Sequence, residues 1–344
     1  MREMGLGLLA SLFFSITFIL NRAMELDGGS WAWSASLRFL FMIPFLLLIV
    51  LLRRGVKQVF IEIAAKPLPW IIWSFIGFVL FYAPLTFAAA YGPGWLVAGS
   101  WQITIVAGVL ISPFLSASAG RKEKLKDKWP VRSLWISLFI LSGIALIQAQ
   151  SFTYISSQDM MFILVPVLVA AFAYPLGNRK MMDLCDGRLD TFQRILGMLL
   201  CTLPVWLIVA GIELVQSGPP SVNQTVQTFI VAVCSGVIAT TLFFIATNAA
   251  RKNKTALASV EATQSLQILF VVVGEWLLLS SPMPNTYAWT GIFIIVAGIS
   301  MHSFSSRQKT NKKPENFSPV FLVIFTVVRY FFSQNHMKSR MSTV

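Results

Sequence analysis

Long apolar stretches alternate along the chain with short polar segments, many of them rich in lysine and arginine. Each apolar stretch holds about 17–25 residues, the length at which an α-helix crosses the hydrocarbon core of a bilayer. The apolar residues are continuous within a stretch, whereas a membrane β-strand alternates apolar and polar positions. The pattern predicts an all-α integral membrane protein with ten spans, at residues 4–20, 34–52, 70–90, 95–115, 133–149, 160–176, 195–212, 226–249, 255–279 and 286–304.

The distribution of charge predicts how these spans are oriented. The loops 53–69, 116–132, 177–194 and 250–254 hold 17 lysines and arginines, whereas the five intervening loops hold Arg22 alone. Cytoplasmic loops of membrane proteins carry the excess of basic residues. We therefore expect the N-terminus and the end of the ten-helix core to be cytoplasmic. This placement also explains the net charge of +13 without nucleic-acid binding.

The two halves of the core are related by an internal repeat. Each half holds five spans, an odd number, so the second half enters the membrane from the opposite side, as in many secondary transporters. We predict a first repeat over 1–150, a second over 151–304, and a basic linker with a short apolar segment over 305–344. The matching positions, 155 to 157 residues apart, are Asn21-Arg22 with Asn178-Arg179, Arg38 with Arg194, and Gly143-Ile144 with Gly298-Ile299.

Two carboxylates, Glu261 and Glu275, fall within the predicted ninth span. A charged side chain near the bilayer centre costs at least about 2.5–3.5 kcal/mol, so it normally faces protein or a water-filled cavity. Glu261, Gln264, Ser265 and Gln267 lie at helical spacing and form one polar stripe. We expect Glu261 and Gln264 to line a substrate cavity, where Glu261 binds a proton or the substrate in turn.

Each carboxylate also has a structural interpretation. Glu261 lies close to the start of its span, where it can instead form an ion pair with Lys252 or Arg251. Glu275 lies near the other end, where a side chain can extend to water, and it is expected to belong to a gate or the scaffold.

Side chains in other spans complete the expected cavity. Tyr82, Trp101, Gln102 and Tyr174 are predicted to contact the substrate, because aromatic faces attract lipophilic cations by about 1–2 kcal/mol when desolvated. Ordinary packing between helices is the alternative for all four.

Two arginines, Arg38 and Arg194, lie about one turn inside their spans. They are expected to act as a gate or scaffold, by capping the cavity, by extending to the interface, or by pairing with a nearby acid. The candidate acids are Glu25 or Asp27 for Arg38, and Asp183 or Asp190 for Arg194.

The ninth and tenth spans read Gly274-Glu275-Trp276, followed by Gly291 seven residues before Gly298-Ile299. This pattern resembles the end of an EamA-type repeat in the drug/metabolite transporter superfamily, and residues 1–304 resemble its bacterial multidrug-resistance efflux branch. The resemblance implies an inverted pseudo-twofold axis and a central cavity lined by the first four helices of each half. It also implies that the fifth helix of each half lies at the periphery.

The related four-span exporters carry a glutamate in their first helix that exchanges a proton for a cationic drug. The first span of this chain offers only Ser11, Ser15 and Thr17, so Glu261 is the candidate for proton coupling. We therefore predict a secondary transporter that exports drug-like molecules or lipophilic cations, with a proton as coupling ion and membrane lipid around it. An exporter of metabolites or amino acids and a non-transporting scaffold are the alternatives.

An enzyme is not expected. The three cysteines form no CxxC pair and the two histidines lie near the C-terminus, so the sequence offers no metal site, cofactor motif or catalytic constellation.

Overall fold

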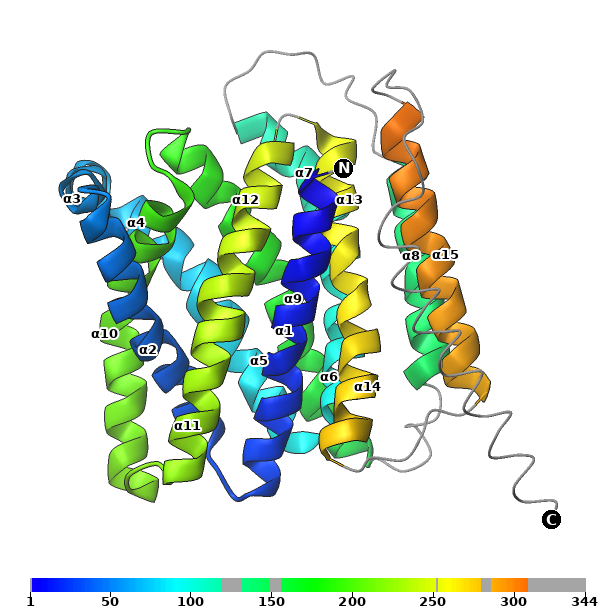
Figure 1. The fold of residues 1–344 in the computed structure, drawn as a ribbon, viewed down its shortest axis with the longest axis horizontal. Helices are drawn as coiled ribbons and strands as arrows, with labels where there is room; N and C mark the ends of the chain where they lie inside the picture. Colours follow the sequence, from blue (N-terminus) through cyan, green and yellow to red (C-terminus); the bar gives the residue numbers. More distant parts are fainter. Residues whose placement is uncertain (1, 119–130, 149–155, 252, 280–285, 309–344) are drawn as a thin grey trace.

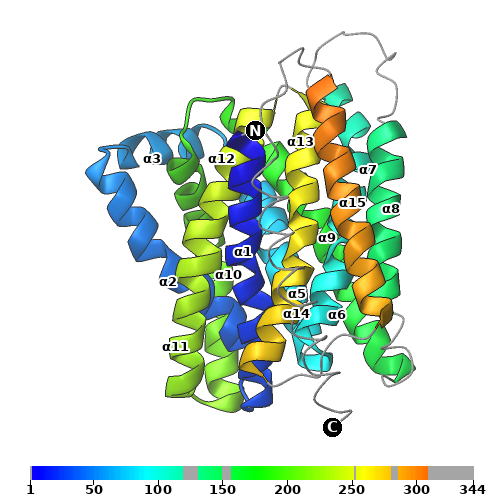
Figure 2. The ribbon, with the colours of Figure 1, turned by 45° about the vertical axis from the view of Figure 1, so that its right-hand side comes forward.

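Apolar helices that lie side by side make up the structure (Figures 1 and 2). The computed structural model describes residues 2–118, 131–148, 156–251, 253–279 and 286–308, and these contain no β-strand. The chain is a multi-pass helical membrane protein. Among the residues described, seven helical segments are long and apolar enough to cross a membrane: Glu3–Leu26, Trp31–Leu52, Pro67–Tyr91, Gly94–Ile111, Gln158–Cys185, Thr191–Ser217 and Val222–Ala250.

These seven segments coincide with the predicted first to fourth and sixth to eighth spans. Two shorter apolar helices, Leu134–Leu146 and Trp289–Gly298, fall in the predicted fifth and tenth spans. The predicted ninth span is also helical, but its helix type changes midway. The apolar run 317–332 lies outside the described residues.

The helices follow one another along the chain with short connections. In order they are α1 (Arg2–Leu26), α2 (Trp31–Leu52), α3 (Val56–Ala65), α4 (Pro67–Ser74), η1 (Phe75–Val79), α5 (Leu80–Tyr91), α6 (Gly94–Trp101), α7 (Ile103–Ser118), α8 (Val131–Gln148), α9 (Ser157–Cys185), α10 (Thr191–Ser217), α11 (Val222–Val231), η3 (Ala232–Ala239), α12 (Thr240–Ala250), α13 (Lys254–Ala262), η4 (Thr263–Leu266), α14 (Gln267–Leu278) and α15 (Thr286–Gln308).

Polar side chains fix where several helices begin. The Ser30 hydroxyl accepts a hydrogen bond from the backbone of α2, and Ser221 does the same for α11. Asp190 and Gln193 form a capping box at the start of α10. These residues satisfy backbone N–H groups that the first helical turn leaves free.

Two predicted helix ends were wrong. Helix α1 continues to Leu26 and α9 to Cys185, so Asn21 and Arg179 lie inside helices and do not end them. Both side chains are buried against other helices, and the neighbouring Asn178 donates to the Thr247 hydroxyl at 3.5 Å.

Four interruptions of helix geometry occur in the middle of long segments. The π-helical turns η1 and η3 precede α5 and α12, and the 3₁₀ turn η4 separates α13 from α14. At Gln102 the helix breaks between α6 and α7, and its backbone N–H donates to the Gly99 carbonyl at 3.0 Å. Interruptions of this kind often mark functional sites.

Helices α8 and α15 pack against each other at one edge of the bundle, and α2 and α10 lie at the opposite edge in both views (Figures 1 and 2). The α8–α15 pair needs a small residue, because a Cβ at Gly143 would meet the Gly291 carbonyl oxygen at 2.7 Å.

The backbones of η1 and α9 approach each other at Gly77 and Gly177. A Cβ on Gly177 would lie closer than 3.0 Å to backbone atoms of Gly77, which no side-chain rearrangement can relieve. Gly211 in α10 is the opposite case, since nothing lies within 4 Å of its Cβ position.

We predict that the same substitution has opposite effects at these two helical glycines. Gly177→Ala forces η1 and α9 apart and lowers the thermal unfolding midpoint of the detergent-purified protein. Gly211→Ala leaves it unchanged or raises it, because alanine favours a helix over glycine by up to about 1 kcal/mol. A Gly177→Ala protein as stable as the Gly211→Ala protein would contradict the close contact.

Candidate functional site

A small cavity lies at the centre of the bundle, between segments from both halves of the chain. Its volume is about 20 Å³, room for about one water molecule. A pocket for a drug-sized ligand needs about 300–1,000 Å³, so the site is closed in this conformation. The residues that line it are Phe14, Thr17, Phe18, Arg38, Phe81, Tyr82, Leu85, Trp101, Tyr174, Ser235, Gln264 and Gln267.

Four of the predicted substrate residues come together in this lining: Tyr82, Trp101, Tyr174 and Gln264. Gln102 is buried but turns back on its own helix, where its side chain donates to the Ala98 carbonyl at 3.1 Å. It lies at the break between α6 and α7 and is not among the residues that line the cavity.

Aromatic rings form one wall of the cavity. The Phe81 ring centre lies 4.6 Å from that of Tyr174 and 5.1 Å from that of Trp101, and Trp101 and Tyr174 are 5.6 Å apart. These rings come from α5, α6 and α9, so both halves of the chain supply them. The wall is suited to a flat apolar group.

Arg38 brings a positive charge to the cavity. Its side chain is buried, its guanidinium carbon lies 3.9 Å from the centre of the Tyr82 ring, and Nη2 donates to the Ser235 hydroxyl at 3.1 Å. Nε and Nη1 have no hydrogen-bond partner in the part of the chain that the structure describes. The expected pairing with Glu25 or Asp27 was wrong, because α2 turns Arg38 toward the interior.

Arg194 repeats this arrangement in the second half. It is buried, its guanidinium carbon lies 4.5 Å from the centre of the Phe244 ring, and Nε and Nη2 have no partner among the described residues. The expected pairing with Asp183 or Asp190 was also wrong. Asp190 instead caps α10 and pairs with Arg53 at 3.3 Å.

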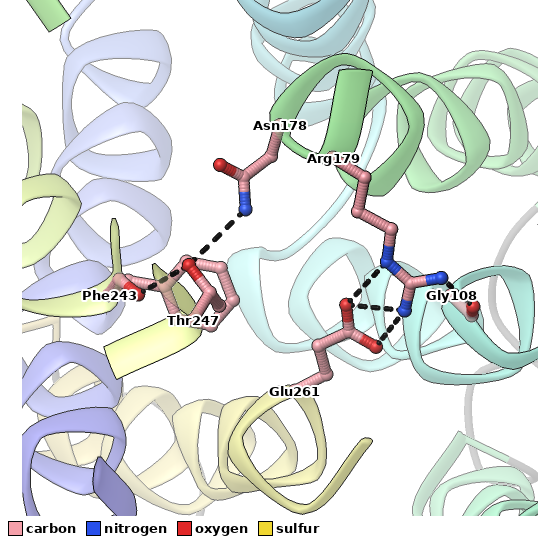
Figure 3. Close-up of polar contacts among 6 residues, drawn as sticks. All are labelled: Gly108, Asn178, Arg179, Phe243, Thr247 and Glu261. Atoms are coloured by element: carbon pink, nitrogen blue, oxygen red, sulfur yellow. Dashed lines mark hydrogen bonds and ion pairs between the residues drawn. The ribbon is translucent and has the colours of Figure 1, made fainter. Parts of the chain in front are cut away.

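Glu261 is held by a partner that the sequence did not reveal (Figure 3). Nη2 of Arg179 lies 2.7 Å from both Glu261 carboxylate oxygens, and Nε of Arg179 also donates to Oε1 at 3.2 Å. Nη1 of Arg179 donates to the carbonyl oxygen of Gly108. Both side chains are buried. We call this set the Glu261 contact, and it joins α7, α9 and α13.

This pairing replaces the alternative in which Glu261 pairs with Arg251 or Lys252. The charge count had assigned Arg179 to a basic loop, because Asn178-Arg179 resembled the end of a span. The available signal was the absence of a helix-breaking residue between Arg179 and Cys185.

Glu275 is buried as well, with 1% of its surface exposed, so the expectation that it extends to water was wrong. Its Oε1 accepts from the Gly94 backbone at 2.9 Å, and its Oε2 accepts from that of Trp95 at 3.3 Å. The first N–H groups of α6 thereby receive a negative charge, as helix N-termini favour. We call this the Glu275 contact.

The Glu261 and Glu275 contacts tie the same two segments together at two levels. Residues 94–118 form one segment and residues 254–278 the other, and α6 packs against α14 as α7 does against α13. The cavity residues Trp101 and Gln264 lie between the two levels in sequence, beside the break at Gln102 and the turn η4.

Fold and site together define a multi-pass membrane protein that encloses a closed, aromatic cavity between its two halves. The family model of EmrE, described as "Putative multidrug resistance efflux transporter", matches residues 1–308. The chain belongs to this transporter family, within the drug/metabolite transporter superfamily that the sequence pattern resembled.

Relatives of the chain occur in bacteria. It is 55% identical to the "Uncharacterized protein YjlA" of Bacillus subtilis (strain 168), over 91% of this chain and 98% of the relative. It is 54% identical to the "Uncharacterized 42.1 kDa protein in intracellular alkaline protease 3'region" of Shouchella clausii, over 77% and 70%. A solved structure described as "Crystal structure of protein" shares the fold, with a TM-score of 0.63 at 14% identity over 90% of this chain and 99% of that one.

We predict that the Arg179–Glu261 pair is strongly coupled energetically. Arg179→Gln or Glu261→Gln alone leaves a buried charge without a partner, which costs about 3–5 kcal/mol. The double variant Arg179→Gln/Glu261→Gln recovers much of this loss, because neither charge remains. Thermal unfolding in detergent measures all three proteins.

The pair of Arg188 and Glu62, at 2.9 Å, provides the control, because the Arg188 side chain is 43% exposed. Arg188→Gln should change stability little, since solvent screens such pairs. Additive losses in the double variant would argue against the buried pair.

Proposed function

We propose that this protein is a secondary transporter that exports small organic molecules across the bacterial inner membrane through its central cavity. The observation that carries the proposal is a closed cavity that both halves of the chain line, beside interrupted helices. Transporters of several folds bind substrate at such interruptions near the middle of the membrane. Membership of an efflux transporter family supports the same function.

The proposed architecture is ten spans in two inverted five-helix repeats, 1–150 and 151–304. One contact recurs in both halves and supports it: Arg38 stacks on Tyr82, and Arg194 stacks on Phe244. In each case an arginine of the second span meets a ring of the third. Phe244 follows Tyr82 by 162 residues, the offset that also separates Gln102 from Gln264 at the two breaks.

The π-helical turns agree with this relation, since η1 lies in the third span and η3 in the eighth. The charge of the loops then supports a cytoplasmic N-terminus and a cytoplasmic end of the core.

The two contacts between the interrupted segments are suited to act as gates. With a cytoplasmic N-terminus, the Glu261 contact lies toward the cytoplasm and the Glu275 contact toward the outside. Alternating access requires that each opens while the other stays closed. Both are closed here, which agrees with the small cavity.

In this proposal, proton coupling works through Glu261 and Arg179. A proton that binds the Glu261 carboxylate removes its negative charge and frees Arg179, which opens the cytoplasmic gate. Substrate can then enter from the cytoplasm, and loss of the proton restores the pair.

The lining of the cavity bears on the substrate class. Its aromatic rings suit drug-like molecules, whereas the Gln264 amide nitrogen, which has no partner among the described residues, favours the second candidate, a metabolite or amino-acid exporter.

We predict that the double variant Arg179→Gln/Glu261→Gln separates folding from coupling. In proteoliposomes with an imposed pH gradient, the wild-type protein should export members of a panel of drugs and metabolites. The double variant should fold and insert but lose at least about tenfold in gradient-driven export, because the Glu261 carboxylate that is proposed to bind the proton is gone. Arg188→Gln serves as the control that keeps transport.

Two results would count against the proposal in different ways. Undiminished export by the double variant would remove Glu261 from the mechanism. Absence of flux for every compound, with correctly folded protein, would favour a scaffold.

A further inference from the structure

We infer that the central cavity is an anion site, in which Arg38 binds the carboxylate of a small organic acid that carries a flat aromatic body. The inference gives a substrate class to the proposed transporter and rests on that function for its physiological meaning. The site itself rests on the charges, free donors and rings around the cavity.

Arg38 is buried with hydrogen-bond donors that the described residues do not use. A buried guanidinium has five N–H donors and a charge, and both normally have partners. Arg38 is 2% exposed, and its Nε and Nη1 have no partner in the described part of the chain. Stacking on Tyr82 compensates part of the charge. A ligand with acceptor oxygens would accept the hydrogen bonds that Nε and Nη1 can donate.

Among the residues described, no acid pairs with Arg38 and so competes with an anionic ligand for it. Glu261 is held by Arg179, and Glu275 by the start of α6. No carboxylate of the described chain lies within ion-pair distance of Arg38. Since the paired charges cancel, Arg38 leaves the cavity with an excess of positive charge. In a medium of low polarity this charge attracts anions strongly.

Other residues of the cavity can bind the remaining parts of such a ligand. Gln264 Nε2 and the Tyr174 hydroxyl line the same cavity and also lack partners among the described residues. Both can donate to a carboxylate oxygen. The rings of Phe81 and Trp101 contact each other, with 5.1 Å between their centres. Together they form a wall against which a flat apolar body can pack.

The same geometry disfavours a lipophilic cation. A cation would bind over an aromatic face, and one of the faces in this cavity, that of Tyr82, already carries the Arg38 guanidinium. It would also lie close to a like charge, and no described carboxylate of the lining would offset that repulsion. The cavity therefore discriminates by charge between molecules of equal shape.

Three probes that share one ring system test this inference: 2-naphthoate, the neutral 2-naphthamide and the cationic 2-naphthylmethylammonium. Calorimetry on the purified full-length protein measures their affinities. We expect 2-naphthoate to bind at least about tenfold more tightly than the amide, because hydrogen bonds between the carboxylate and the Arg38 guanidinium are stronger than those of a neutral amide. The cation should bind most weakly.

Arg38→Gln should abolish the preference for the anion and leave the affinity for the amide within about threefold, because the aromatic wall remains. Arg194→Gln is the matched control: this arginine is equally buried and stacked but does not line the cavity, so the preference should remain. Circular dichroism and thermal unfolding establish that each variant is folded. If Arg38→Gln fails to fold, the order of the three probes on the wild-type protein decides alone.

Binding of the cation as tightly as the anion, or an anion preference that survives in folded Arg38→Gln, would overturn the inference. Flux in proteoliposomes separates this failure from failure of the proposed function. Tight binding of 2-naphthoate without flux of any probe would support the anion site and contradict transport. Flux of the cation without binding of the anion would support transport and contradict the anion site.

Discussion

Charge buried inside a bundle that lipid surrounds is the constraint on which this structure depends. An ionised group in such a place is costly unless other groups compensate its charge and its hydrogen-bonding capacity. Glu261 meets both needs through Arg179, and Glu275 meets them through the first N–H groups of α6. Arg38 and Arg194 meet these needs only in part: both stack on rings, and Arg38 also donates one hydrogen bond to Ser235. The protein thus separates charges with full sets of partners, which hold segments together, from buried arginines whose donors are only partly used.

The interrupted helices explain how satisfied and unsatisfied groups can lie so close together. A continuous α-helix uses its own backbone groups and presents only side chains, whereas the break at Gln102 and the turn η4 alter the path of the backbone at the cavity. Above and below these points, the Glu261 and Glu275 contacts hold the same two segments. A change in either contact can therefore move one end of a segment without unfolding the other. This is the mechanical basis for the gates proposed above.

The sequence predicted the positions of the apolar spans well, because hydrophobic length is a local property. It also brought Tyr82, Trp101, Tyr174 and Gln264 to one place, since these are the polar and aromatic residues of spans that were expected to surround a cavity. Their role as substrate contacts stays a prediction.

Which charged residues pair with each other could not be predicted from the sequence in the same way. The expected partners of Arg38, Arg194 and Glu261 were acids or bases nearby in the sequence, whereas Glu261 binds Arg179, 82 residues away. Glu275 was expected to extend to water because it lies near a helix end, yet the end of another helix covers it. Which charges meet depends on how distant helices pack, and periodicity within one helix does not contain that information.

The central claim is that the Arg179–Glu261 pair closes the cytoplasmic side of the cavity. Ser235, which is fully buried in the lining, can be replaced by cysteine in a protein without the three native cysteines. The rate at which a membrane-impermeant thiol reagent modifies it from each side of the membrane then tests the claim. We predict slow modification from both sides, and acceleration from the cytoplasmic side alone when Arg179→Gln and Glu261→Gln are added. An unchanged rate, or acceleration from the outside, would contradict the account.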